Sequence, residues 1–145
     1  MNLEKRTTIV ELISAFFILL FVYAALSKVL DFEKFRVELG KSPLLNSSSF
    51  EISIMIPIIE ILFSVFLVIK RLQLIGLYAA FALMVMFSCY ILAILKFSSY
   101  IPCSCGGILQ NMSWNQHLIF NLVFIGLAII AVLIYPKKNK DLIAQ

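Results

Sequence analysis

Four long apolar runs divide this chain and restrict its fold more than any other feature. They cover approximately residues 8–28, 50–69, 72–95 and 115–135. A helix of about 20 apolar residues crosses the roughly 30 Å hydrocarbon core of a bilayer, so each run is long enough to span a membrane. Backbone groups in lipid must bond within their own segment, so we expect each run to be α-helical. The sequence therefore predicts an all-α integral membrane protein: one membrane domain over residues 1–145, built as a four-transmembrane-helix bundle.

The composition excludes a soluble enzyme, a disordered chain and a secreted miniprotein. Hydrophobic residues make up 62% of the chain and charged residues 14%, whereas an ordinary soluble domain has about 25% charged residues. The basic residues lie between the apolar runs and not in an aromatic-lined groove, so we expect no nucleic-acid partner. The first run lacks a small-residue cleavage site after it, so we expect a retained helix in the lipid bilayer.

The connections predict the orientation of the bundle. Seven Lys and Arg residues fall on the side of the two termini and five on the other side. Because positive charges collect on the cytoplasmic side, we expect both termini in the cytoplasm and the connections 29–49, which is mostly polar, and 96–114 outside. The two sets are Lys5, Arg6, Lys70, Arg71, Lys137, Lys138 and Lys140, and Lys28, Lys34, Arg36, Lys41 and Lys96.

The second outer connection contains the clearest chemical motif, Pro102-Cys103-Ser-Cys105-Gly-Gly. A disulfide between thiols this close in sequence would be strained, and strained, exposed disulfides are the labile and catalytic kind. Asn111 or Ser113 can cap the following helix, whose N-terminus would lower the pKa of a nearby thiol. The motif predicts redox activity for Cys103 and Cys105, with a passive local disulfide or incidental cysteines as the alternatives.

Polar residues within the apolar runs predict a second site. A carboxylate in mid-membrane is costly, so Glu60 is expected to face the bundle interior, where Lys28 can offer a counter-charge. On the helical rise, Tyr23, Cys89 and Asn121 fall about 10 Å from the outer face and Glu60 about 13 Å from it. This predicts a polar layer with one residue from each helix. The layer could relay protons or simply hold the helices together.

His117 and Cys89 each allow two interpretations. His117 could lower a thiol pKa or move a proton, or it could pack at the membrane interface. Cys89 could be a third relay thiol or a small apolar side chain between helices. A zinc site made of these two residues with Cys103 and Cys105 lacks the paired spacing of structural zinc sites, so we expect no metal.

Three segments together resemble the MauE and DoxX-like family of redox-associated membrane proteins. They are FVYAALSKVLDFEKF, the P-x-x-E of Pro57 to Glu60, and PCSCGG followed by SWNQHLIFNLVF. The resemblance spans most of the chain and implies a four-span bundle in a bacterial inner membrane, with the Cys-x-Cys loop outside, in the periplasm. MauE-type proteins are associated with disulfide formation in a periplasmic dehydrogenase subunit during methylamine utilisation. The resemblance thus implies redox work for Cys103 and Cys105 and a supporting position for Lys28 and Glu60.

The predicted function is thiol–disulfide exchange, as a thiol–disulfide oxidoreductase acting on a periplasmic thioredoxin-like protein or an exported client with cysteines. The chain resembles more loosely the DsbB and VKOR-type bundles, which pass electrons to a quinone, but it departs from their Cys-x-x-Cys spacing. A quinone near Glu60 and His117 could take up the electrons. The alternatives are a non-enzymatic subunit or scaffold of a larger complex and a carrier of small lipophiles. The apolar surface of so small a bundle would also suit an oligomer.

Overall fold

The computed structural model describes residues 2–41, 46–97 and 113–136, and its regular structure within these ranges is entirely helical. Four helices are long and apolar enough to cross a membrane, which confirms the predicted all-α, four-span bundle. Their bounds follow the predicted runs closely, except that the first helix begins earlier, at Leu3. The elements are α1 (Leu3–Leu30), α2 (Phe32–Gly40), η1 (Asn46–Ser48), α3 (Ser49–Val68), α4 (Gln73–Phe97) and α5 (Trp114–Ile134).

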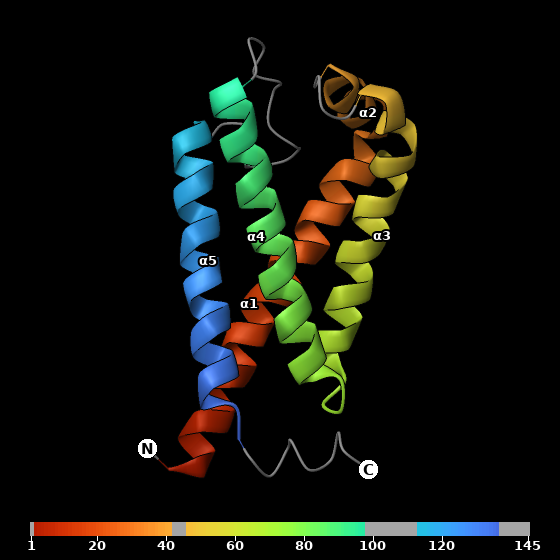
Figure 1. The fold of residues 1–145 in the computed structure, drawn as a ribbon. Coiled ribbons are helices and arrows are strands. Elements are labelled where there is room, and N and C mark those ends of the chain that lie inside the picture. The colour runs from red at the N-terminus through yellow and green to blue at the C-terminus, as the bar shows by residue number, and fades with distance from the viewer. Residues whose placement is uncertain (1, 42–45, 98–112, 137–145) are drawn as a thin grey trace.

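The bundle consists of two helix pairs that diverge toward one end (Figure 1). Helix α1 packs mainly on α3, and α4 packs mainly on α5. The pairs join at the end where α1 begins and α5 ends, where Val10 and Phe17 of α1 share a core cluster with Ala128 and Ala131 of α5. At the opposite end, α2 lies beside the ends of α1 and α3 (Figure 1).

In α3, small and polar residues make up most of the buried face, while many large aliphatic residues face outward. Ile58 and Val65 of this helix, for example, are exposed at 60% and 46%. Lipid is as apolar as leucine, so transmembrane helices gain by placing small or hydrogen-bonding residues between them. The buried face of α3 consists of Ser53, Pro57, Glu60, Ser64 and Leu67.

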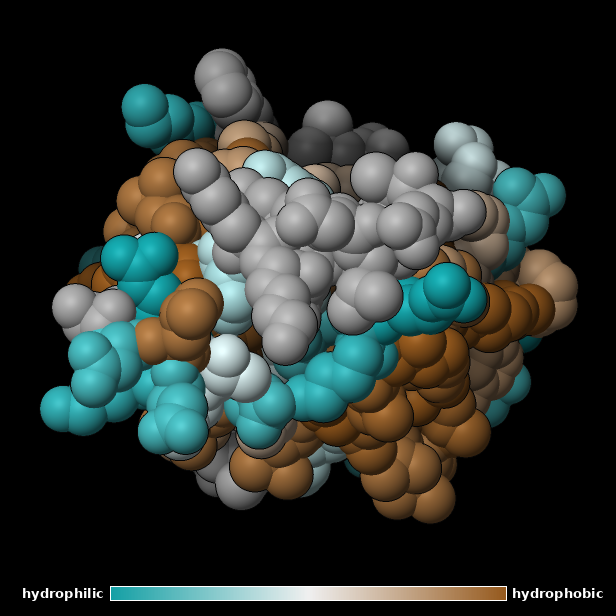
Figure 2. Space-filling view, turned by 90° about the horizontal axis from the view of Figure 1, so that it is seen from below, coloured by the Kyte–Doolittle hydropathy of each residue, from teal (hydrophilic) through white to brown (hydrophobic). Residues whose placement is uncertain are grey.

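Polar contacts also tie α1 to the turn between α3 and α4. Lys70 forms an ion pair with Glu11, and the Gln73 side-chain amide donates a hydrogen bond of 3.2 Å to the Ser14 hydroxyl. Figure 2 views the bundle from this end and shows hydrophilic residues spread across it among hydrophobic side chains. Such a polar end is what a membrane-spanning bundle presents where its helices leave the lipid.

Helix α2 differs from the polar connection that the sequence predicts for residues 29–49. Its Phe35 and Leu39 are buried, at 5% and 4% exposure. The two residues are four positions apart, so one turn of helix places both on the same face. That spacing is sufficient to fold a short amphipathic helix against the end of the bundle.

The α3–α4 hairpin depends on a close approach at Gly76. A Cβ atom there would lie 3.0 Å from the backbone nitrogen of Leu67 and 3.1 Å from its Cγ, whereas a Cβ on Gly126 would meet nothing within 4 Å. We expect Gly76→Leu to lower the free energy of unfolding by about 1–3 kcal/mol, as overpacking does. The matched variant Gly126→Leu should have little effect. Unfolding of the two detergent-purified variants measures both free energies of unfolding. Equal losses of stability in the two variants would contradict the close approach at Gly76.

Candidate functional site: a buried ion pair beside an apolar cavity

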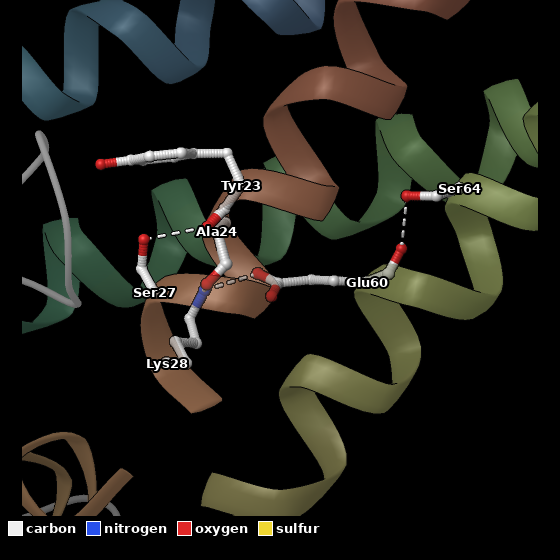
Figure 3. Close-up of polar contacts among 6 residues, drawn as sticks. All are labelled: Tyr23, Ala24, Ser27, Lys28, Glu60 and Ser64. Carbon is white, nitrogen blue, oxygen red and sulfur yellow. Dashed lines mark hydrogen bonds and ion pairs between the residues drawn. The ribbon is translucent and has the colours of Figure 1, made fainter. Parts of the chain in front are cut away.

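Lys28 and Glu60 form an ion pair inside the bundle (Figure 3). Lys28 Nζ lies 2.7 Å from Glu60 Oε1, and the two side chains are only 5% and 1% exposed. The same Nζ donates a hydrogen bond of 3.3 Å to the carbonyl oxygen of Ala24. The predicted counter-charge is therefore present, and it joins α1 to α3 inside the bundle, where a lone charge would be costly.

Both charged residues continue the buried faces of their helices. In α1, Lys28 lies one turn after Ala24 and two turns after Phe21, which are also buried. In α3, the Ser64 hydroxyl donates a hydrogen bond of 2.9 Å to the Glu60 carbonyl oxygen. Pro57, one turn before Glu60, has no backbone N–H, so α3 lacks one helical hydrogen bond on this face.

Helix α2 covers the ion pair from the end of the bundle. Lys28 Nζ lies 5.9 Å from the centroid of the Phe35 ring, which is within the range of a cation–π contact. The ring thus shields the charges from the end of the bundle while adding no polar group. The site predicted from the sequence does not include Phe35, although the spacing of Phe35 and Leu39 indicates a buried helix face.

An apolar cavity of about 390 Å³ adjoins the ion pair. It is lined by residues from all five α-helices, among them Phe35 and Leu39 of α2. Its volume falls within the range typical of small-molecule sites, which are mostly apolar with a few convergent polar groups. The polar groups at this cavity are Lys28, Glu60, Tyr90, Trp114, His117 and Asn121.

Three buried polar atoms at the cavity have no hydrogen-bond partner within the described part of the chain. They are Glu60 Oε2, His117 Nδ1 and Asn121 Nδ2. Buried polar atoms in folded proteins are nearly always paired, so three such atoms around one cavity require an explanation. They give the site one strong acceptor, one amide donor and one imidazole nitrogen that can serve as either.

Helix α5 brings His117 and Asn121 to the cavity, as one turn of helix separates them. The helix begins with a capping box: the Ser113 hydroxyl accepts a hydrogen bond from the Gln116 backbone N–H, and the Gln116 side chain accepts one from Ser113 N–H. This confirms Ser113 as the cap. The cap fixes where α5 starts and therefore which of its side chains reach the cavity.

The structure does not assemble the predicted four-residue polar layer. Cys89 is exposed on the surface of α4, so its expected place in the layer is wrong: it follows the buried Ser88 by one position and is turned off that face. Tyr23 is half-buried, and its ring points away from Glu60 (Figure 3). Only Glu60 and Asn121 of the four reach the cavity.

Cys103 and Cys105 lie outside the described residues. They belong to the connection between α4 and α5, and this connection ends at Trp114, which lines the cavity. The redox roles of the two cysteines and the supporting roles of the other site residues stay predictions.

A comparison with protein families finds a match to the model described as methylamine utilisation protein MauE, over residues 6–134. The match covers all four long helices apart from the first three residues of α1, and it confirms the resemblance carried by the sequence motifs. Searches among curated proteins and among solved structures each return no significant match.

The ion pair should behave as one unit when it is mutated. We expect Lys28→Met or Glu60→Leu alone to lower the free energy of unfolding by about 3–5 kcal/mol, because each leaves one buried charge uncompensated. The double variant should recover most of that loss. A double-mutant cycle measured by unfolding in detergent tests this, and additive losses would contradict the coupling.

The exposed pair of Arg36 and Glu33, whose side chains are 2.8 Å apart, is the control. Its side chains are 40% and 72% exposed, and exposed pairs contribute little to stability. Arg36→Met should therefore leave unfolding almost unchanged.

Proposed function

Because the chain belongs to the MauE family of methylamine utilisation proteins, we propose that it is a membrane-embedded thiol–disulfide exchange protein. It assists disulfide formation or redox maturation of exported proteins. The observation that carries this proposal is the Cys103-Ser-Cys105 motif in the connection between α4 and α5. An exported enzyme subunit with cysteines to be paired, such as one used in methylamine utilisation, is the kind of client that fits.

The exchange conserves electrons at every step. A client thiolate attacks one sulfur of the Cys103–Cys105 disulfide, which breaks that bond, forms a mixed disulfide and releases the other cysteine as a thiolate. The second client thiolate then attacks the mixed disulfide, so the client keeps the new disulfide and Cys103 and Cys105 are left reduced. A periplasmic thioredoxin-like protein in its disulfide form restores the pair by the same chemistry.

Two features support a reactive pair in this connection. The connection leads into the N-terminus of α5, and helix N-termini favour a nearby thiolate over the neutral thiol. Pro102 on one side and Gly106 on the other bracket the motif, and a glycine lets the backbone of a partner approach.

We further infer that the protein lies in a bacterial inner membrane with the cysteine connection on the periplasmic side. The basis is the excess of Lys and Arg on the side of the two termini. Periplasmic proteins can hold disulfides, whereas cytoplasmic thiols are kept reduced. This orientation is the one in which the proposed exchange could act on exported clients.

The cavity favours one second candidate, a carrier of small lipophiles. Its walls are apolar, and it lies within the helix bundle. A carrier would need the cavity but not the cysteines. Substitution of the cysteines should therefore abolish thiol exchange but leave a carrier function intact.

Serine substitutions test thiol exchange directly. In either Cys103→Ser or Cys105→Ser, the remaining thiolate should attack the disulfide of the oxidised thioredoxin-like partner and form a mixed disulfide, which no second cysteine of the motif can resolve. This species should be visible on non-reducing gels and lost on reduction. The double variant should trap nothing, and reduced client should accumulate in cells. Normal client oxidation by a stably produced double variant would exclude thiol exchange and favour the scaffold or carrier.

Cys89→Ser is the matched control for these variants. Cys89 is the one cysteine of the chain outside the motif, and it is exposed on α4 and does not line the cavity. Its substitution should leave both client oxidation and partner trapping unchanged.

An impermeant maleimide tests the orientation in intact cells that carry Cys89→Ser. Cys103 and Cys105 should be labelled from outside, and only after reduction if the pair is a disulfide. Labelling that requires disruption of the membrane would show the opposite orientation and would exclude periplasmic exchange.

A further inference from the structure

The cavity combines apolar walls with polar atoms that lack partners. Glu60 and Asn121 are 1% and 2% exposed, and in each the atom without a partner among the described residues, Oε2 or Nδ2, is itself buried. His117 Nδ1 is also buried and has no hydrogen-bond partner among the described residues. Leaving a buried polar atom unpaired is costly, so a ligand that pairs all three atoms would gain affinity by doing so.

The charges at the site favour a neutral ligand. Lys28 and Glu60 neutralise each other at 2.7 Å, and a net charge added to so apolar a cavity would be costly. The ligand also needs both kinds of hydrogen-bonding group. Asn121 Nδ2 can only donate, ionised Glu60 Oε2 can only accept, and His117 Nδ1 can do either.

The lining and position of the cavity favour a flat ring with an apolar chain. Phe87, Trp114 and Phe120 contribute aromatic walls, which stack well on a flat ring. Met55 and Met86 also line the cavity, yet they are 55% and 52% exposed. The cavity therefore reaches the outer surface of the helices, where a lipid-soluble molecule could enter.

We propose that this cavity is a binding site for a lipid-soluble quinone and its quinol. The carbonyl oxygens of the quinone accept hydrogen bonds from Asn121 and His117, and a hydroxyl group of the quinol donates one to Glu60 Oε2. The oxidised and reduced forms thus use the same three atoms in different combinations. This mixed set of donors and acceptors distinguishes the site from one for a plain acyl chain.

The binding site consists of described residues alone. The redox role of the bound quinone rests on the proposed thiol exchange. Client oxidation leaves two electrons and two protons on the Cys103–Cys105 pair. A quinone would offer a second route to reoxidation beside the thioredoxin-like protein, because taking up both would convert it to the quinol and return the pair to the disulfide.

The chain carries its own probe of binding, because Trp114 is its one tryptophan and lines the cavity. Decylubiquinone titrated into the purified protein should quench Trp114 fluorescence saturably. Asn121→Leu should weaken binding about tenfold, the equivalent of about 1.4 kcal/mol or one buried hydrogen bond. Leu122→Ala, at an exposed neighbouring position on α5, should bind as the unsubstituted protein does.

Two further measurements keep the test decisive. Decylbenzene has the ring and the chain but no oxygen atoms, and it should compete poorly with decylubiquinone. His117→Leu provides a second variant should Asn121→Leu fail to fold, and melting temperatures identify that case. Quenching that does not saturate, equal binding by Asn121→Leu and Leu122→Ala, or equal competition by decylbenzene would each overturn the proposal.

The Cys103→Ser/Cys105→Ser double variant separates this inference from the proposed function. It should bind decylubiquinone normally, because neither cysteine is among the proposed ligands. If the double variant loses client oxidation but the unsubstituted protein does not bind decylubiquinone, the quinone site alone is overturned. Quinone binding together with normal client oxidation by the double variant would overturn thiol exchange alone.

Discussion

The ion pair between Lys28 and Glu60 constrains how α1 and α3 can pack. Each charge would be costly against lipid, so both helices must turn these residues toward each other. Helical periodicity then decides the rest of each buried face. Phe17 and Phe21 lie on the same buried face of α1 as Lys28, and Ser64 lies on the same buried face of α3 as Glu60. A buried pair adds little net stability over apolar residues of similar size, but breaking it is costly, so here it fixes the arrangement of the two helices.

The two ends of the bundle are built differently. At one end, Gly76 lets α4 approach Leu67 of α3, and the ion pair between Glu11 and Lys70 ties α1 to the turn. The helix pairs diverge toward the other end (Figure 1), and the cavity lies between them with Phe35 of α2 in its wall. The close-packed end holds the four helices together, which leaves the divergent end free to form a site.

The sequence predicts the helices of this fold but not their rotations. Long apolar runs identify spans because lipid requires them, and the cost of a buried charge is enough to pair Glu60 with Lys28. Hydropathy cannot tell the lipid-facing side of α4 from its buried side, because both are apolar. Ser88 is therefore buried while Cys89 beside it is exposed. The cavity depends on such rotations in every helix, so only its individual polar residues could be predicted.

A buried carboxylate could act as a fixed hydrogen-bond acceptor or as a proton relay, and the geometry distinguishes these two roles for Glu60. One oxygen of Glu60 is bound to Lys28, and the other lies at the cavity without a partner among the described residues. A proton added to Glu60 would leave the Lys28 charge uncompensated in an apolar interior, at a cost of several kcal/mol. The arrangement therefore favours Glu60 as a fixed hydrogen-bond acceptor held by Lys28 over Glu60 as a proton relay.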